Sequence, residues 1–462
     1  LNLIGRSQER LQVARALLVI QQCSQLRRVL SIQVDGIYLQ PGTRELPKVQ
    51  RRFRALKYAD LPKIGRPLAK GFSRVRQDPS TIQEYVYKCN ETEPRFPGGT
   101  LRIADHVDPP YHKKVEWNII EEPTNGPDDF VDRVLEHVRA GKSFTCLGAP
   151  GTGKSKGILA KVREDLLARG EHVVCLAPTH AAARQLPNGD TIHHFVGKFA
   201  MRGTFKGWIL LDEVSMCVLP VLAALDQLRL VGTKICCFGD WDQLPPVGNS
   251  WRGHPVEAQA FRTSRLYKLW SDCTMFRLTR CRRSDQLHFD FYTSLPRKLS
   301  EAIATSQSRY GQADDADLHV CISHRRRRAI AHEKQKRLAQ GKESVEIPEG
   351  DDPAWKCFAG TKLVGNSSTG RVVNGGRYIV TRIGDKATLK DDLEEDTFEI
   401  SLDAIGKCCL LAHALVYNKV QGATENGTVI LHDTSSKYFR REHLYVGLSR
   451  TTAGANAFVA VD

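Results

Sequence analysis

Short apolar runs alternate with amphipathic stretches along most of the chain from about residue 140 onwards. Strands that alternate with helices in this way are typical of parallel sheets wrapped by helices. Seven such runs are spread over about 320 residues, which is more than one sheet needs, so the pattern predicts two α/β domains. The predicted strands are 143–147, 172–177, 208–213, 234–240, 318–323, 427–431 and 456–461.

The pattern changes to a period of two between about residues 346 and 407. Two alternating stretches, 377–384 and 396–402, flank the acidic segment KDDLEED at 390–396. A period of two predicts a small antiparallel β insertion, and we expect its acidic tip to be a solvated loop.

These changes divide the chain into a basic N-terminal region of uncertain fold, a nucleotide-binding α/β domain and a second α/β domain interrupted by the β insertion. The expected segments are 1–120, 121–275, 276–345, 346–407 and 408–462.

Composition adds a strong positive charge, +15 at pH 7. The first 120 residues hold 21 lysines and arginines against 11 acidic residues, and one strand is predicted there over 29–39. Solvated charge and nucleic-acid binding both explain such an excess. No apolar run is long enough for a membrane span, and the 13 cysteines form no C-x-x-C pair. We expect an intracellular protein that is not secreted, in the nucleus, another DNA-containing compartment or a viral or cytoplasmic setting.

A glycine-rich loop, GAPGTGKS, lies between a predicted strand and a predicted helix. Its glycines allow successive backbone N–H groups to surround a phosphate at a helix N-terminus. Lys154 is placed to reach the β and γ phosphates of ATP, and Ser155 to bind Mg²⁺. The predicted ATP-binding residues are Gly148, Ala149, Pro150, Gly151, Thr152, Gly153, Lys154 and Ser155.

Two acids end the next apolar strand, WILLDE. Asp212 is expected to bind magnesium together with Ser155, and Glu213 to deprotonate the attacking water. This pair favours ATP hydrolysis over phosphoryl transfer to a small acceptor, since a kinase does not activate water. A third strand ends in GDWDQLPP, where the amide of Gln243 could donate to a γ-phosphate oxygen and accept from the water.

The ordered set GAPGTGKS, LAPTHAAARQL, TIHHF, ILLDEVSM, GDWDQLPPVG, LTRCRRSD, ALVYNKVQGAT and YVGLSRT resembles superfamily 1 DNA helicases of the RecD/Pif group over about residues 140–462. The resemblance implies two RecA-like domains with ATP between them, an SH3-like β insertion in the second, and movement along single-stranded DNA, 5′→3′. It implies ATP and Mg²⁺ as cofactors. No membrane association is expected, and protein partners stay open.

By that resemblance, Arg283 and Arg450 match arginines that reach the γ-phosphate. The positions that match nucleic-acid contacts are Pro178, Thr179, Thr191, His193, Lys419, Gln421 and Gly422. The run of four arginines at 325–328 is explained equally well as a solvated helix start or as a grip on DNA phosphates.

The sequence also departs from the family. No glutamine occurs over 117–147, where the family reads adenine, and Asn418 and Val420 replace a histidine and a serine. The segment that often separates strands is absent or minimal between Phe195 and Trp208, so translocation is expected before vigorous unwinding. An RNA-directed helicase of the same superfamily, or a P-loop ATPase of viral or mobile-element origin that lacks strand separation, remain alternatives.

Residues 29–39 faintly resemble the metal-binding strand turn of family B DNA polymerases, with Asp35 in place of one carboxylate and Gln33 where the other would be. Loss of one of two metal-binding acids would disable two-metal chemistry. A structural hairpin or a decayed remnant is therefore expected instead of an active site.

Overall fold

The computed structural model describes residues 29–33, 36–39, 95–96, 99–100, 116–123, 129–199, 205–229, 232–251, 254–257, 260–349 and 352–461. The chain divides into two compact units, Leu1–Val115 and Glu116–Asp462. In the first unit, two strand pairs are described: β1 (Val29–Gln33) with β2 (Gly36–Leu39), and β3 (Arg95–Phe96) with β4 (Gly99–Thr100), both antiparallel. The single strand expected over 29–39 is thus a hairpin, and Asp35 lies outside the described residues.

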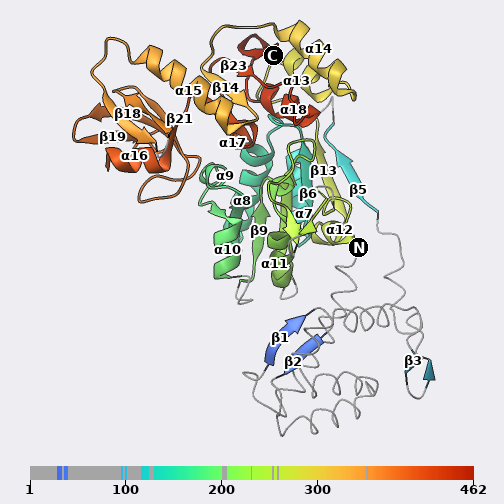
Figure 1. Cartoon of the computed structure of the whole chain (residues 1–462). Helices are drawn as coiled ribbons and strands as arrows, with labels where there is room; N and C mark the ends of the chain where they lie inside the picture. The colour runs from blue at the N-terminus through green and yellow to red at the C-terminus, as the bar shows by residue number, and fades with distance from the viewer. Residues whose placement is uncertain are drawn as a thin grey trace. The chain divides into compact units, whose positions relative to one another are not determined.

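The second unit contains a seven-stranded sheet in the order β5-β13-β6-β10-β9-β7-β8, in which every pairing is parallel (Figure 1). All four residues of β9 are buried, as a strand covered on both faces requires. The four strands predicted before residue 241 are confirmed, whereas β5, β8 and β13 were not predicted. The strands are β5 (Asn118–Glu121), β6 (Thr145–Gly148), β7 (Val173–Ala177), β8 (Asp190–Thr191), β9 (Trp208–Leu211), β10 (Lys234–Gly239) and β13 (Thr274–Leu278).

Helices follow the strands of this sheet, and we call the sheet with its helices the first lobe. Its core contains an aromatic group, Phe144, Phe238 and Phe276, whose rings meet edge to face at 5.5 Å. The helices are α7 (Phe130–Arg139), a π-helical segment (Lys154–Leu159) that continues into α8 (Ala160–Ala168), α9 (His180–Arg184), α10 (Ile192–Lys198), a 3₁₀ turn (Val214–Met216), α11 (Leu219–Arg229) and α12 (Arg265–Trp270). A short hairpin pairs β11 (Ser250–Trp251) with β12 (His254–Pro255).

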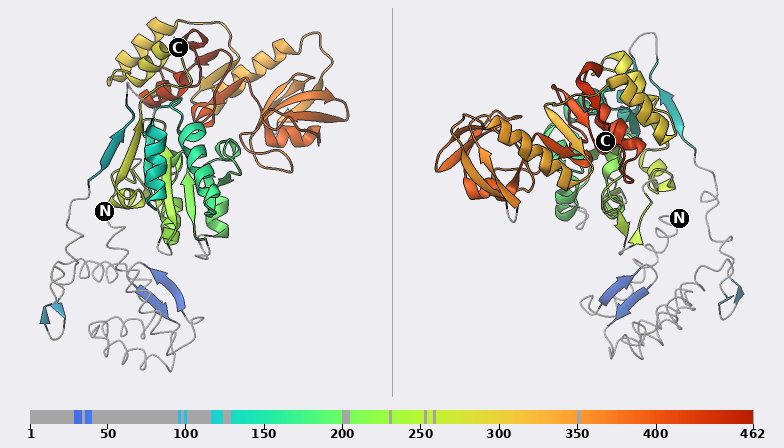
Figure 2. Two further views of the ribbon diagram at one scale, coloured as in Figure 1. Left: turned by 180° about the vertical axis from the view of Figure 1, so that it is seen from behind. Right: turned by 45° about the horizontal axis from the view of Figure 1, so that its top comes forward.

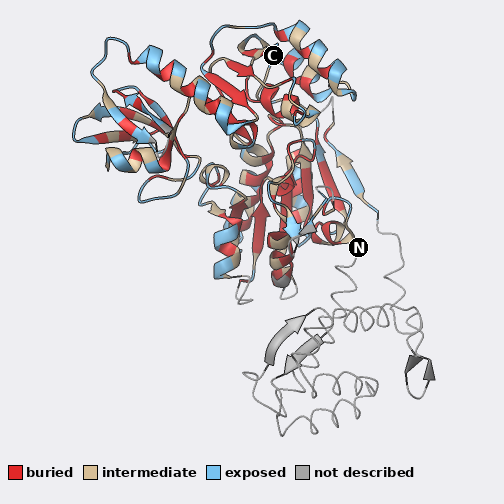
Figure 3. Ribbon diagram, viewed as in Figure 1, coloured by how far each residue is buried: buried red, intermediate tan, exposed pale blue. Residues whose placement is uncertain are grey.

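A second parallel sheet, in the order β22-β14-β23-β24, forms the second lobe together with its helices. Most strand residues of both sheets are buried, except in the edge strand β5, and α15 carries many exposed residues (Figure 3). The prediction of two α/β domains is therefore confirmed. The elements are α13 (Gln286–Thr293), α14 (Leu299–Tyr310), β14 (Leu318–Cys321), α15 (His324–Leu338), β22 (Ala414–Val416), α17 (Tyr417–Val420), β23 (Val429–Leu431), α18 (Arg441–Leu448), a 3₁₀ turn (Gly454–Asn456) and β24 (Ala457–Val459).

An antiparallel five-stranded sheet, in the order β20-β19-β18-β17-β21, interrupts the second lobe, as the period of two predicted. Helix α15 connects the two, because it contacts β14 and β22 on one side and β16 and β21 on the other (Figure 2). The elements are β15 (Val345–Glu349), β16 (Asp352–Cys357), β17 (Lys362–Gly365), β18 (Arg377–Ile383), β19 (Lys386–Asp391), β20 (Thr397–Ser401), α16 (Leu402–Cys408) and β21 (Cys409–Leu411).

Two details differ from expectation. The two alternating stretches were expected to flank the acidic segment directly. The structure has a further strand, β19, between them, so the acidic segment connects β19 to β20. The expected boundary at 275/276 falls inside β13, which pairs with β6 up to Leu278 opposite Gly148, so the first lobe extends at least to Leu278. Among the described residues, no helix is long and apolar enough to cross a bilayer.

The Phe144→Ala variant should lose about 3–5 kcal/mol of unfolding free energy, because a large buried side chain is removed from a packed aromatic group. Chemical denaturation followed by tryptophan fluorescence measures this loss. Leu167→Ala is the matched control, since Leu167 is 45% exposed. Equal losses in the two variants would contradict the assigned core.

Candidate nucleotide-hydrolysis site

The phosphate loop leaves β6 and turns sharply before the π-helical segment. Gly151 and Gly153 have φ values of 87° and 93°, which favour glycine. A Cβ at Gly148 would lie 2.6 Å from Thr152 Oγ1 and 2.9 Å from Leu278 Cβ. Thr152 closes the turn by donating its hydroxyl to Ala149 O at 2.8 Å. The glycines that the sequence singled out are therefore required by the backbone path.

Lys154 begins the helix and its side chain is buried inside this loop. Its ammonium donates to Gly148 O at 2.6 Å and to Ala149 O at 3.1 Å. The charge of Lys154 is thus held inside the cradle of backbone N–H groups that a phosphate would enter.

Ser155 and Asp212 meet across the loop, with the Ser155 hydroxyl donating to Asp212 Oδ2 at 2.6 Å. Burial raises the pKa of the Asp212 carboxyl, and the Ser155 hydrogen bond and the Lys154 charge oppose that shift. Hydroxyl and carboxylate oxygens are ligands that Mg²⁺ prefers, so this pair fits the ion that the sequence predicted.

Glu213 adopts a left-handed backbone, with φ of 49°, which is costly for a side chain of this kind. Its Oε2 is buried and has no hydrogen-bond partner among the described residues. Burial, followed by the neighbouring Asp212 charge, raises the pKa of Glu213 to about 7. A carboxyl with that pKa is suited to accept a proton near neutral pH.

Gln243 lies on the loop that follows β10 and is also buried. Its Oε1 has no hydrogen-bond partner in the described part of the chain. Gly239, at the end of β10, packs on the turn after Glu213, since an added Cβ would lie 2.9 Å from Val214 Cγ1. The two loops that carry Glu213 and Gln243 are therefore in direct contact.

The two arginines named from the sequence differ in their surroundings. Arg283 donates to Thr424 Oγ1 at 2.7 Å and to Ser449 O at 2.6 Å, and its Nε approaches the position of a Cβ on Gly151 to 3.3 Å. That Nε is buried without a described partner. Arg283 therefore lies between the phosphate loop and the second lobe.

Arg450 is only 1% exposed, and its guanidinium donates to oxygens of the second lobe. The acceptors are Val446 O at 2.8 Å, Val420 O at 3.1 Å, Ala423 O at 2.8 Å and Ser449 Oγ at 2.7 Å. Burial, with the nearby Arg283 charge, lowers its pKa to about 10. In this structure Arg450 therefore connects segments of the second lobe to one another.

Arg282, which the sequence analysis did not single out, holds the phosphate loop. It donates from Nη1 to Thr152 O at 2.8 Å, and its backbone N–H bonds Gly151 O at 2.9 Å. Its Nη2 is paired with the buried Glu122. Burial raises the pKa of Glu122, but bonds from Arg282 and from the N–H groups of Arg280 and Thr279 hold it below its usual range. Because β5 was not predicted, the sequence offered no sign that Glu122 is buried beside Arg282.

The residues expected to contact nucleic acid occupy both lobes. The hydroxyls of Thr179 and Thr191 cap α9 and α10, accepting the N–H of Ala182 at 3.2 Å and of His194 at 3.3 Å. His193 is exposed at the start of α10, and Pro178 is half-buried before α9.

In the second lobe, Lys419 donates to Asn366 Oδ1 at 3.0 Å and to Asn374 Oδ1 at 3.3 Å, both on the β insertion. Gln421 donates to Leu244 O of the first lobe at 3.2 Å. Gly422, with φ of 77°, faces Glu213, because an added Cβ would lie 4.0 Å from Glu213 Oε1.

The four-arginine run begins α15 after the N-cap Ser323. Arg325 is exposed, Arg326 pairs with Asp433 at 3.1 Å and Arg327 is buried. The run therefore begins a helix, as one of the two interpretations predicted, although Arg326 and Arg327 lie against the lobe. A grip on DNA phosphates stays a prediction.

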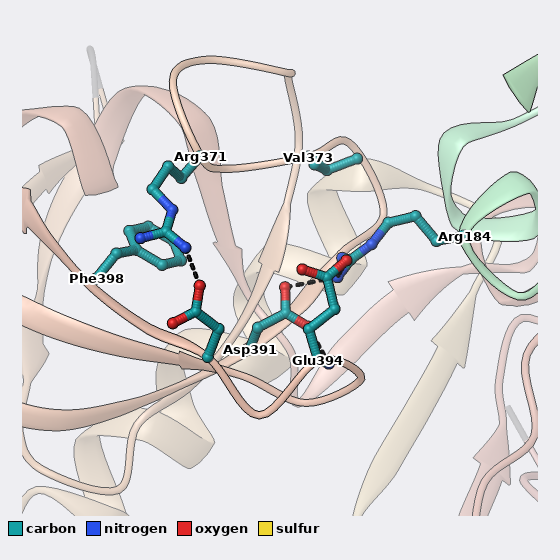
Figure 4. Close-up of a pocket in the computed structure, with 7 residues that line it drawn as sticks. Arg184, Arg371, Val373, Asp391, Glu394 and Phe398 are labelled. Carbon is teal, nitrogen blue, oxygen red and sulfur yellow. Dashed lines mark hydrogen bonds and ion pairs between the residues drawn. The ribbon is translucent and has the colours of Figure 1, made fainter. Parts of the chain in front are cut away.

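The acidic tip of the β insertion is exposed over 392–396, as predicted, and two of its acids are also paired with the first lobe. Arg184 of α9 reaches Asp391 Oδ2 at 2.7 Å and Glu394 Oε1 at 3.1 Å (Figure 4). Asp391 is buried, and Arg371 lies in the same cavity of about 60 Å³. The positive charge of Arg184 on α9, which is distant in sequence, explains why the acidic turn lies against this helix.

Comparisons with known proteins agree with this architecture. A family model described as an AAA domain matches residues 132–269. The ATP-dependent RecD2 DNA helicase of Deinococcus radiodurans is 30% identical over 176 residues, 34% of this chain and 23% of that protein. The match thus spans less than a quarter of the length of this curated relative.

Among solved structures, the Pif1 helicase from Candida albicans matches with a TM-score of 0.54 and 20% identity, over 73% of this chain and 96% of that one. Bacteroides Pif1 bound to ssDNA matches with a TM-score of 0.52 and 19% identity, over 72% and 92%. The RecA-like fold is confirmed, as is the resemblance to superfamily 1 helicases of the RecD/Pif group.

The hydrolysis rate should rise with pH between about pH 6 and pH 8 and level off above, because a raised pKa leaves Glu213 protonated, and unable to accept a proton, below about pH 7. Steady-state phosphate release across this range measures the effect. Glu213→Gln should lower the rate by about 10²–10⁴-fold and remove the pH-dependent rise. A rise that persists at the same midpoint in Glu213→Gln would contradict the assignment.

Proposed function

We propose that this chain is an ATP-dependent DNA helicase or translocase that moves on single-stranded DNA and couples ATP hydrolysis to closure of its two RecA-like lobes. The observation that carries the proposal is the buried cluster of Lys154, Ser155, Asp212 and Glu213, faced by Gly422 of the second lobe. The Deinococcus relative is named as an ATP-dependent DNA helicase, which supports the same activity here.

In this mechanism the loop Gly148–Ser155 holds the phosphates of ATP, and Lys154 exchanges its carbonyl partners for β and γ phosphate oxygens. Ser155 and Asp212 would hold Mg²⁺, which neutralises charge on the phosphates. Glu213 accepts a proton from the attacking water, while the buried oxygen of Gln243 orients that water.

Arg283 is placed to respond to the γ-phosphate, because it already bridges the phosphate loop and the second lobe. Arg450 contributes a second positive charge from the second lobe and requires rearrangement of its backbone hydrogen bonds to reach the phosphate. Cations supplied across a cleft stabilise the transition state only when the cleft is closed.

Single-stranded DNA would be held by Pro178, Thr179, Thr191 and His193 on the first lobe and by Lys419, Gln421 and Gly422 on the second. The hydroxyls of Thr179 and Thr191 use acceptor positions as helix caps and retain their protons to donate to phosphate oxygens. Gln421 connects this surface to the loop of Gln243 through Leu244 O. A 5′→3′ direction follows from the family resemblance.

Lys154→Ala should abolish phosphate release stimulated by single-stranded DNA, a loss of about 10²-fold or more, because a cation on the transferring phosphate is removed. Lys156→Ala, an exposed position in the same helical segment, should retain activity. Parallel assays with DNA and RNA of equal length identify the preferred strand. Unchanged stimulation in Lys154→Ala would contradict the motor.

The affinity for single-stranded DNA should fall steeply with salt and vary little with sequence, since phosphate contacts release counterions. Lys419→Ala should reduce the slope of log affinity against log salt by about 0.7, the value for one phosphate contact on a single strand. Lys407→Ala, whose ammonium pairs with Asp403 on an exposed helix, should leave the slope unchanged. Equal slopes for the wild type and Lys419→Ala would remove Lys419 from the contact surface.

A further inference from the structure

Two tyrosines of the second lobe form buried hydrogen bonds to the two loops of the first lobe that surround the hydrolysis site. Tyr445 of α18 donates its hydroxyl to Asp240 Oδ2 at 2.6 Å. Tyr292 of α13 donates to Pro150 O of the phosphate loop at 2.8 Å. Both side chains are at least 94% buried, so water does not compete for these bonds.

The two tyrosines lie next to each other in the second lobe. Their rings meet edge to face with centroids 5.8 Å apart, and the helices that carry them are in contact. Tyr292 also packs edge to face on Phe289 and His288 within α13. A displacement of this part of the second lobe therefore moves both phenol groups together.

Asp240 is the receiving group on the first lobe. It directly follows β10, it is buried, and its Oδ1 accepts the backbone N–H of Asp242 at 3.0 Å. One carboxylate thus closes the turn that leads to Gln243 and also bonds Tyr445. Because a buried carboxylate that loses a partner is costly, the loop and the second lobe are held in a fixed relation.

From Asp240 the contact continues to the water-activating acid. The preceding residue, Gly239, leaves no space for a side chain, since a Cβ would lie 2.9 Å from Val214 Cγ1 and 3.2 Å from Val214 N. Val214 is bonded in sequence to Glu213 and begins the 3₁₀ turn. A movement of Asp240 must therefore displace the backbone next to Glu213.

We propose that Tyr445 is a positioning residue, which transmits the position of the second lobe through Asp240 to Glu213 and Gln243, and that Tyr292 does the same for the phosphate loop. This inference rests on the proposed function and adds to it the route by which lobe closure assembles the site. Neither tyrosine needs to touch ATP or nucleic acid.

The test compares Tyr445→Phe with Tyr310→Phe in the full chain. Tyr310 is a matched control, because its buried hydroxyl bonds His288 within the second lobe at 2.8 Å and crosses to no loop of the first. We expect Tyr445→Phe to lower stimulation of hydrolysis by single-stranded DNA about 10-fold or more, because a misplaced catalytic group slows the chemical step. The KM for ATP should stay within about two-fold, since uniform binding is unaffected.

Tyr310→Phe should keep the stimulation, and thermal unfolding of both variants monitors the fold. Equal stimulation in the two variants would overturn the role of Tyr445 while leaving the motor intact. A wild-type chain that single-stranded DNA does not stimulate would overturn the proposed function and this inference with it.

A double-mutant cycle isolates the bond itself. Asp240→Asn removes the negative charge and leaves one side-chain oxygen. An asparagine that keeps the bond from Asp242 N–H presents its NH₂ group to Tyr445 and loses the charge-assisted bond that the phenol donates. In the Tyr445→Phe background, Asp240→Asn should therefore reduce stimulation by less than it does alone. Independent, multiplying effects would show that the two residues act separately and would overturn the proposed route.

Discussion

The hydrolysis site depends on two adjacent carboxylates, Asp212 and Glu213, buried beside one buried ammonium, Lys154. Burial disfavours charge on both acids, and the Asp212 charge raises the pKa of Glu213 further. The Ser155 hydroxyl at 2.6 Å and the Lys154 charge counter this for Asp212, whereas Glu213 retains a pKa of about 7. Because the surroundings of the two acids differ, Asp212 is suited to bind a metal ion together with Ser155, and Glu213 is suited to accept a proton from water.

Residues of the second lobe also contribute to the surroundings of these carboxylates. Arg450 and Gly422 lie near Glu213, Gln421 bonds the carbonyl of Leu244, and the phenol of Tyr445 bonds Asp240. The bonds of Gln421 and Tyr445 are buried and specific in direction, so they support discrete arrangements of the lobes instead of gradual deformation. The proposed closure of the lobes would therefore act on Glu213 through these contacts.

The features that were predicted correctly are those that a short local stretch of sequence determines. Four strands of the first sheet, the glycine loop and the acids at the end of β9 follow from apolar runs and their terminal residues, because parallel strands direct their carboxyl ends to one edge. Strands β5 and β13 were missed, since β13 was hidden by a polar residue at Arg277 and the edge strand β5 is largely exposed.

Contacts between segments distant in sequence were not predictable. Arg282 and Glu122 are brought together by the β5–β13 pairing, and Arg184 meets Asp391 only because the β insertion folds toward α9. The exposure of residues 392–396 was predicted, but the pairing of Asp391 with Arg184 was not. The bond between Tyr445 and Asp240 joins the two lobes, and no periodic pattern in the sequence predicts a contact between them.

If nucleotide and single-stranded DNA act on the same two-lobe equilibrium, a non-hydrolysable ATP analogue must change the affinity of this chain for DNA. Measured with and without the analogue, the Kd for DNA should differ by about 5–150-fold, and DNA should change the Kd for the analogue by the same factor, as linkage requires. Identical DNA affinity with and without the analogue would contradict a shared equilibrium.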